Sequence, residues 1–223
     1  MLPLVFGLRN KPEVGSATFK RLGLDAMNLN PLQPSLAILA GPEGAGKLTV
    51  AEFLLDNRSL VSFINADYIE RSLMRANPEA APIEAGRLLL GQLYQALNNK
   101  SDVSFETAMS GKTWVSVIYK ARRAGYEVTL CYVAVSSSYI SLARAVSRVA
   151  RGGHNIPPDT IHRRYARSLH NFFSLYSALV DNWYFFGNSA TSALLLGCRE
   201  GMTAEPRYLF QEEYEQFRSK ALG

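Results

Sequence analysis

The sequence predicts an α/β fold, a three-layer α/β/α sandwich in which a mainly parallel five-stranded sheet lies between helices and carries a helical lid. Three observations support this prediction. Short apolar runs alternate along the chain with longer segments of helical period. A glycine-rich segment separates the first apolar run from the first helical segment. The chain has 223 residues, enough to bury a substantial core as one domain with appendages.

The five expected strands are short runs of mostly apolar residues, at 35–40, 60–65, 103–106, 127–135 and 183–186. The first run is almost wholly apolar, which is typical of a parallel strand buried on both faces. The expected helices follow the runs, at 47–56, 82–97, 112–124, 139–151 and 157–179. Pro82 suits a first helical turn, and Gly125 suits a helix end. In the last helix, apolar residues at Ile161, Tyr165 and Leu169 recur with a helical period.

The chain divides into three expected parts. Residues 1–35 are rich in Gly, Pro and Asn and are expected to form an irregular extension, with one short helix near 19–24. Residues 36–190 form the main domain, whose lid covers about 144–167. Residues 191–223 are expected to be a helical tail, with a helix from 205 to 221, that packs on the same domain.

The composition is that of a globular protein, with a net charge of +5. No apolar run is long enough to span a bilayer, and the N-terminus lacks the pattern of a secretory signal. We therefore expect no membrane partner and a cytoplasmic location, in a bacterium or in a host cell that receives the protein as an effector. Cys131 lies in an apolar run and is expected to be reduced, and no His/Cys cluster predicts zinc.

The glycine-rich segment matches the phosphate-binding pattern G-x-x-x-x-G-K-[ST] except at its last position. Its residues are Gly41, Pro42, Glu43, Gly44, Ala45, Gly46, Lys47, Leu48 and Thr49. Backbone N–H groups of such a loop surround a phosphate chain at a helix N-terminus, and the lysine reaches the β- and γ-phosphates. The predicted fold is therefore of the P-loop NTPase, kinase-like type. The alternative, a glycine-rich turn without a ligand, is disfavoured because the glycines and the lysine fall in register between a strand and a helix.

Leu48 occupies the position of the hydroxyl that normally binds magnesium. Thr49 does not simply replace it, because one step along a helix rotates a side chain by ~100°. Magnesium usually keeps several waters, so another water can fill the gap. No residue of this sequence is therefore assigned as a metal ligand.

Polar side chains follow two further strands. Asn65 and Asp67 come after the second strand, and Glu106, Thr107 and Ser110 come after the third. The carboxyl ends of parallel strands meet at one edge of a sheet, where ligands bind. Asp67 is placed to take a proton from an acceptor hydroxyl, and the whole set suits a substrate with several hydroxyls. The alternatives are structural: Asp67 caps a helix that starts near Tyr68, and Ser110 caps the next helix.

Arginines concentrate in the predicted lid, at Arg148, Arg151, Arg163 and Arg164, on two helices that Gly152 and Gly153 separate. Such a lid neutralises charge as a γ-phosphoryl group moves. The alternative is a solvated basic face. Nucleic-acid binding is disfavoured because the nearby aromatic residues follow a core spacing and do not form a stacking platform.

Taken together, these segments resemble the zeta toxin family of P-loop kinases, in particular its small stand-alone bacterial branch. That branch has the patterns G-P-N-G-A-G-K-S-T, N-A-D, S-F-E-T-T-L-S-G, R-V-x-x-G-G-H-x-V-P, R-R-Y-x-R-S-L-x-N and a late N-S. The corresponding segments here are 41–47, 65–67, 104–111, 148–157, 163–171 and 187–189, and the resemblance covers 36–190. Three residues depart from the family pattern: Leu48 replaces serine, Glu43 replaces asparagine and Ala108 replaces threonine.

The resemblance implies phosphoryl transfer from ATP, with Mg²⁺, to a hydroxyl of a sugar. Characterised zeta toxins phosphorylate UDP-N-acetylglucosamine, and the family implies an antitoxin as a protein partner. By this resemblance Asp67 is the base, Lys47 and the lid arginines hold the triphosphate, and Glu106 and Thr107 contact the acceptor.

Two functions remain open at this stage. The first is an ATP-dependent kinase that phosphorylates a small molecule, which the retained Lys47, Asp67, Glu106 and lid arginines favour. The second is a catalytically weakened nucleotide-binding protein that acts through a protein partner, which Leu48 and Glu43 favour.

Overall fold

The computed structural model describes residues 33–56, 62–73, 80–150, 156–188 and 193–223. The side chains of 52–56, Asp67, Arg71 and Pro82 lie outside this description. The expected extension over 1–35, with its short helix near 19–24, also falls almost wholly outside the described residues. The strands are β1 (Ser35–Ala40), β2 (Phe63–Ile64), β3 (Val103–Thr107), β4 (Glu127–Ala134), β5 (Asn182–Gly187), β6 (Leu194–Glu200) and β7 (Arg207–Tyr208). The helices are α2 (Lys47–Asp56), α3 (Ala66–Leu73), α4 (Ala81–Asn99), α5 (Thr113–Arg123), α6 (Ser138–Val149), α7 (Pro158–Asn171), η1 (Phe172–Tyr176), α8 (Ser177–Leu179) and α9 (Gln211–Leu222).

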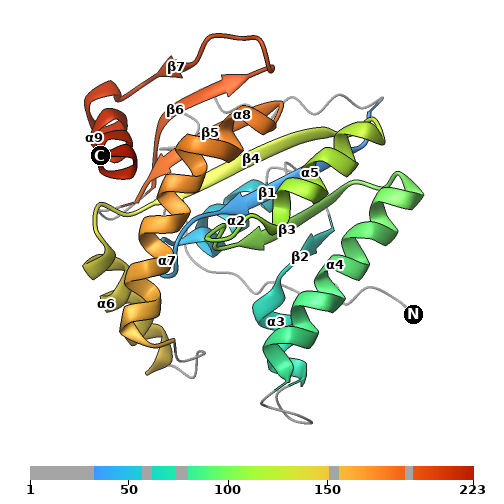
Figure 1. Cartoon of the computed structure of the whole chain (residues 1–223), viewed down its shortest axis with the longest axis horizontal. Helices are drawn as coiled ribbons and strands as arrows, with labels where there is room; N and C mark the ends of the chain where they lie inside the picture. Colours follow the sequence, from blue (N-terminus) through green and yellow to red (C-terminus); the bar gives the residue numbers. More distant parts are fainter. Residues whose placement is uncertain (1–32, 57–61, 74–79, 151–155, 189–192) are drawn as a thin grey trace.

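The strands form one sheet in the order β2-β3-β1-β4-β5-β6-β7, in which β1 to β5 are parallel (Figure 1). The mainly parallel α/β prediction is thus confirmed, but the sheet has seven strands where the sequence predicted five. The two additional strands are antiparallel and come from the expected helical tail over 191–223. The apolar run in β6 has no period that separates a strand from a helix, so only its pairing with β5 fixes it as a strand.

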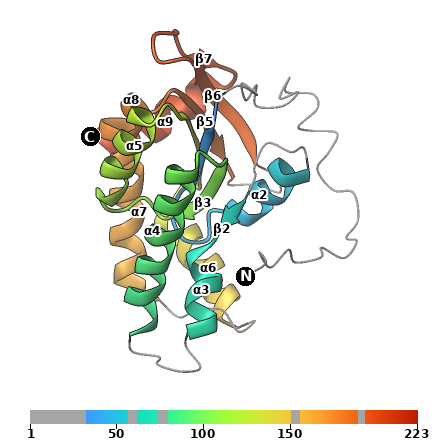
Figure 2. The same ribbon diagram turned by 90° about the vertical axis from the view of Figure 1, so that its right-hand side faces the viewer.

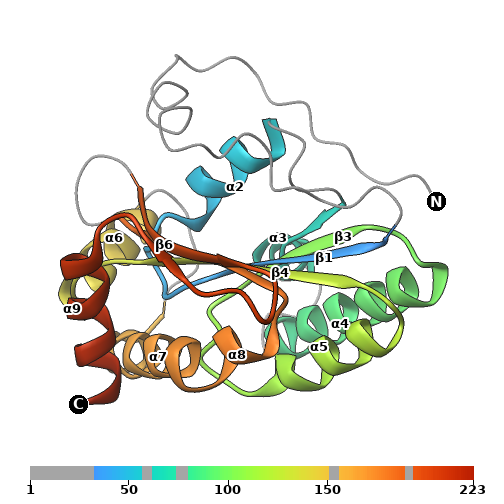
Figure 3. The ribbon, with the colours of Figure 1, turned by 90° about the horizontal axis from the view of Figure 1, so that it is seen from above.

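Helices cover both faces of the sheet. Figure 3 shows α4, α5, α7 and α8 on one face and α2 on the other, and Figure 2 gives the same arrangement from the side. The helix expected in the tail is present as α9, where Tyr214 stacks on Trp183 with ring centroids 5.9 Å apart, and Phe217 contacts Phe185. No helix in the described ranges is long and apolar enough to cross a membrane.

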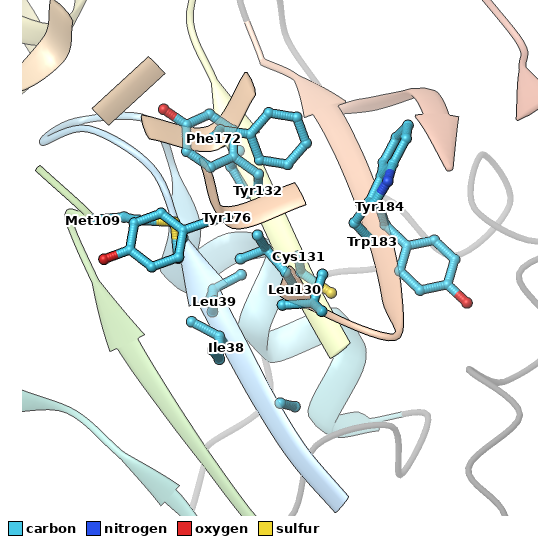
Figure 4. Close-up of a cluster of buried hydrophobic side chains, with 14 of the residues drawn as sticks. Ile38, Leu39, Met109, Leu130, Cys131, Tyr132, Phe172, Tyr176, Trp183 and Tyr184 are labelled. Atoms are coloured by element: carbon cyan, nitrogen blue, oxygen red, sulfur yellow. The ribbon is translucent and has the colours of Figure 1, made fainter. Parts of the chain in front are cut away.

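The helix expected over 157–179 is interrupted by the π-helical segment η1, in which the N–H of Ser177 donates to the carbonyl of Phe172. A π turn closes its hydrogen bond over one residue more than an α-helical turn and is therefore wider. Here it allows two consecutive side chains to reach the sheet: the rings of Phe172 and Phe173 lie 5.0 and 5.4 Å from that of Phe185. Phe172 is fully buried and also contacts Tyr132, within the core cluster of Figure 4.

The aromatic cluster around Phe172 yields a stability prediction. Phe172→Ala should lower the free energy of unfolding by about 3–5 kcal/mol, because it removes a fully buried ring and leaves a cavity. Urea denaturation followed by circular dichroism measures the change.

The matched control is Tyr119→Ala on α5, whose side chain is 52% exposed. A surface substitution of this kind should change the free energy of unfolding by no more than about 0.5 kcal/mol. Equal losses in the two variants would contradict the described packing of η1 on the sheet.

Candidate active site

The carboxyl ends of the five parallel strands lie at one edge of the sheet, and the phosphate-binding loop starts there. The loop leaves β1 after Ala40, which pairs in register with Thr107 of β3. The N–H of Gly41 donates to the carbonyl of Thr107 at 3.3 Å, so the first residue of the loop is tied to the end of β3. This contact brings the loop beside the polar segment that follows β3.

The loop takes a conformation that requires glycine. Gly41, Gly44 and Gly46 have φ angles of 141°, 70° and 88°, in the region that side chains disfavour. A Cβ atom on Gly41 would lie 2.0 Å from the backbone oxygen of Val133, so the loop approaches β4 more closely than any side chain permits. The predicted glycines therefore have the structural role that a phosphate-binding loop gives them.

Three residues that the sequence analysis did not select hold the loop from outside. The amide of Asn188, just after β5, donates to the carbonyl of Ala45 at 2.7 Å. From α6, the hydroxyl of Ser141 donates to the carbonyl of Glu43, and Nη1 of Arg144 donates to the carbonyl of Asn188 at 2.9 Å. Asn188 lies in the late N-S pattern of the family resemblance, but its contact with the loop depends on tertiary structure that no spacing reveals.

Lys47 is nearly buried, with 9% of its side chain exposed, and its ammonium group folds back on the loop. Nζ donates to the carbonyls of Gly41 and Pro42 at 2.9 and 3.0 Å. It also lies 3.4 Å from Oε1 of Glu106, at the end of β3. The ammonium is therefore held at the mouth of the loop, between the loop backbone and a carboxylate.

Asn65, Lys47 and Glu106 form one connected network. Nδ2 of Asn65, which directly follows β2, donates to Oε2 of Glu106 at 2.7 Å. The structure thus brings together the predicted phosphate-binding lysine and two of the predicted acceptor residues. Asp67 is the second residue of α3, so it lies inside the first turn and not at the expected cap position. Its side chain is among those outside the description.

Thr107 is the last residue of β3, and Ser110 lies in the turn between β3 and α5. The hydroxyl of Thr107 accepts hydrogen bonds from the N–H of Met109 and from the indole of Trp114, at 3.0 and 2.7 Å. It is therefore occupied by the turn itself. The structural alternative for Ser110 was wrong, because α5 begins after Lys112 and its start has no side-chain cap.

This turn is held by the helix that carries the lid arginines. Ser168, Asn171 and Tyr176 donate to the carbonyls of Ala108, Met109 and Gly111 at 2.5, 3.0 and 2.7 Å. Burial raises the pKa of Tyr176 to about 12, so its hydroxyl remains a proton donor at neutral pH. Ser168 and Asn171 of the segment 163–171, with Tyr176 of η1, thus hold the backbone of this turn, a role that the sequence analysis did not assign.

The lid arginines take different positions. Nη1 of Arg164 lies 2.9 Å from Oε1 of Glu43, which joins α7 to the phosphate-binding loop. Arg163 is exposed, and its guanidinium donates to Thr160 on its own helix at 3.4 Å. Arg148 lies in the last turn of α6 and is partly buried. Arg151, with the predicted Gly-Gly hinge, is outside the described residues.

Leu48 and Thr49 open α2, and both are exposed, Leu48 with 42% of its side chain accessible. Leu48 offers no oxygen to a cation. Within the described part of the chain, no group of three or more His, Cys, Asp or Glu side chains is arranged to hold a metal ion.

Comparison with known families identifies the chain. The family model described as zeta toxin matches residues 22–181, which is most of the chain, and the protein therefore belongs to the zeta toxin family. An uncharacterised protein of Haemophilus influenzae is 31% identical over 134 residues, which are 60% of this chain and 94% of that protein.

Solved structures agree with the kinase-like P-loop fold. A complex of AvrRxo1-ORF1 with AvrRxo1-ORF2 and ATP matches with a TM-score of 0.65 and 18% identity, over 93% of this chain and 68% of that one. In the same complex with sulphate ions, this chain spans 65% of the matched chain. The PezAT toxin–antitoxin system of Streptococcus pneumoniae matches with a TM-score of 0.57 and 15% identity, over 92% and 93% of the two chains.

The close approach of Gly41 to β4 yields a prediction for the loop. Gly41→Ala should lower the free energy of unfolding by more than about 1 kcal/mol, because alanine is strained at this φ angle and its methyl group meets the backbone of Val133. Urea denaturation of the purified variant measures the change.

Gly91→Ala on the exposed face of α4 is the matched control, since a Cβ atom there meets nothing within 4 Å. This substitution should be neutral or stabilise by about 0.4–1 kcal/mol. A Gly41→Ala variant as stable as Gly91→Ala would mean that the loop does not take the described conformation.

Proposed function

We propose that the protein is an ATP-dependent phosphotransferase that phosphorylates a hydroxyl of a small molecule. The observation that carries the proposal is the network of Lys47, Glu106 and Asn65. It connects the phosphate-binding loop with the ends of β2 and β3, so a bound triphosphate and a polar acceptor would meet at one edge of the sheet. Membership of a kinase-like family supports the same reaction.

Each residue then has a defined task. When ATP binds, the ammonium of Lys47 gives up its hydrogen bonds to the two loop carbonyls and donates to the β- and γ-phosphates instead. Arg148 and Arg164 neutralise negative charge on the transferred phosphoryl group. Asp67, in the first turn of α3, accepts the proton of the attacking hydroxyl. Asn65 and Glu106 orient the acceptor, while Thr107 and Ser110 shape the turn that lines it.

Magnesium fits this donor set only as a largely hydrated ion. When bound, it would supply positive charge that lowers the negative charge of the phosphates. Glu106, whose Oε1 lies 3.4 Å from Nζ of Lys47, would help to hold the hydrated ion. Leu48 contributes no oxygen, so the chain holds the metal less firmly than a loop with serine at this position.

The acceptor that the family suggests is UDP-N-acetylglucosamine. A sugar with several hydroxyls suits two carboxylates and an amide at one edge of the sheet. A protein partner of the antitoxin type is also part of the proposal. The matched AvrRxo1-ORF1 structure contains AvrRxo1-ORF2, and the matched PezAT structure comes from a toxin–antitoxin system. The site of action that we propose is a cytoplasm, where ATP and nucleotide sugars occur.

A second candidate is a weakened nucleotide-binding protein that acts through its partner. The exposed Leu48 favours it, because the loop lacks the usual side-chain ligand for magnesium. The two candidates differ in turnover and not in nucleotide binding.

Asp67→Asn tests the kinase assignment. With magnesium, ATP and UDP-N-acetylglucosamine, the natural chain should form ADP and a phosphorylated sugar. The variant should lose at least about a hundredfold in kcat while its affinity for ATP stays the same, since the base acts on the acceptor. Product formation is followed by mass spectrometry, and nucleotide affinity by calorimetry. A fully active Asp67→Asn variant would remove Asp67 from the mechanism.

Leu48→Ser tests the role of the metal. Restoring the hydroxyl should raise kcat and lower the magnesium concentration that gives half-maximal activity. If the new ligand lowers the activation free energy by ~1.4 kcal/mol, kcat rises about tenfold. Turnover confined to the Leu48→Ser variant would favour the second candidate, a protein disabled as a kinase. An unchanged rate and metal dependence would mean that the natural site positions the ion by other groups.

A further inference from the structure

We infer that Glu43 is a positioning residue, which holds the guanidinium of Arg164 over the phosphate-binding loop for the terminal phosphate of a triphosphate. The inference rests on the proposed function. It assigns a role to the residue of the loop that departs from the family pattern, where a carboxylate would otherwise repel phosphate.

In the contact between the two side chains, Glu43 is buried and Arg164 is partly exposed to solvent. Only 6% of Glu43 is exposed, whereas the side chain of Arg164 is 43% exposed. Oε1 of Glu43 accepts from Nη1 of Arg164 at 2.9 Å, and Oε2 is buried with no hydrogen-bond partner among the described residues. The carboxylate therefore holds the guanidinium by a single contact, and other N–H donors of Arg164 remain for an anion from solvent.

The backbone that carries the Glu43 carboxylate is held in place by α6. The carbonyl of Glu43 accepts from the hydroxyl of Ser141, and the next residue, Gly44, lies so close to α6 that a Cβ atom there would be 2.6 Å from the carbonyl of Ser141. The backbone at Glu43 consequently has little freedom. A long arginine side chain loses conformational entropy when it is ordered, and a fixed carboxylate orders it before the nucleotide arrives.

The charges support this arrangement. An unpaired buried carboxylate next to a triphosphate is unfavourable, but the positive charge of Arg164 compensates that of Glu43. The guanidinium can contact a carboxylate and a phosphate at once, because its donors point in several directions within one plane. ATP differs from ADP by its terminal phosphate, and this is the phosphate that Arg164 would contact. The Glu43–Arg164 pair should therefore increase the affinity for ATP more than that for ADP.

Two other effects of Glu43 predict the opposite result. A carboxylate that merely repels phosphate, or one that competes with phosphate for Arg164, weakens nucleotide binding. Removing it would then tighten the complex. The sign of the change in affinity therefore separates positioning from both alternatives.

A double-mutant cycle tests the inference, with Glu43→Ala, Arg164→Ala and the double variant. Calorimetry measures binding of a non-hydrolysable ATP analogue and of ADP. Arg164→Ala should weaken binding of the analogue by about tenfold or more, since it removes a charge-assisted contact. Glu43→Ala should weaken it in the same direction by about threefold or more, and the double variant should be no weaker than Arg164→Ala. In each variant ADP binding should change clearly less than binding of the analogue, because ADP lacks the terminal phosphate that Arg164 would contact.

Glu43→Gln keeps an acceptor oxygen at the position of Oε1 and should retain more of the affinity and rate than Glu43→Ala. In turnover assays, Glu43→Ala should lower kcat by about 10- to 100-fold, because a displaced guanidinium no longer meets the transferred group, and KM for the acceptor should not change. The Glu215–Arg218 pair on α9, with Nη1 and Oε1 3.3 Å apart, is the matched control. Alanine at either position should leave binding and turnover unchanged.

An unchanged or tighter affinity of Glu43→Ala for the ATP analogue would overturn the inference. So would equal effects on the analogue and on ADP, or additive losses in the double variant. The binding cycle does not need an acceptor, so it remains decisive if no acceptor supports turnover. In that case the proposed function fails while the role of Glu43 toward the nucleotide is still measured.

Discussion

The burial of one positive charge organises the site. The ammonium of Lys47 has little access to water, so it requires acceptors from the protein, and it finds them in two loop carbonyls and in Glu106. Glu106 is fixed in turn by Asn65, from the neighbouring strand. The ends of β1, β2 and β3 must therefore be in register for the lysine to be satisfied. If the phosphates of a nucleotide replaced the protein acceptors of Lys47, the contacts at the ends of all three strands would change together.

The segment 163–171 combines two roles that follow from helical geometry. Tyr165, Ser168 and Asn171 lie on the buried face of α7, where they donate to the backbone carbonyl just after β4 and to those of the turn after β3. Arg164 lies on a different side of the same helix and reaches the phosphate-binding loop. One short stretch thus fixes the turn after β3 and places a cation at the phosphate-binding loop. A movement of α7 would change both halves of the site together.

The local parts of this protein could be predicted from its sequence, and the tertiary ones could not. The five parallel strands and the glycine loop follow from apolar runs and from Gly41, Gly46 and Lys47, because these features depend on neighbouring residues. The strand β6 was missed because its apolar run suits a helix equally well until β5 pairs with it. The π turn at Phe172 depends on packing against Phe185, and the pairing of Glu43 with Arg164 joins residues far apart in the chain. From the sequence alone, Glu43 therefore favours a weakened nucleotide-binding protein, although the fold supplies a partner for its carboxylate.

The outer strands of the sheet, β2 and β7, are each two residues long. A sheet edge exposes unpaired backbone groups, and a long edge serves as a template on which another chain can polymerise. Among the described residues, β7 pairs with β6 only at Gly197 and Cys198, and Arg207 places a charged side chain on β7. Short outer strands and edge charges interrupt the flat template that a long edge would offer, so they disfavour fibre-like growth from the sheet.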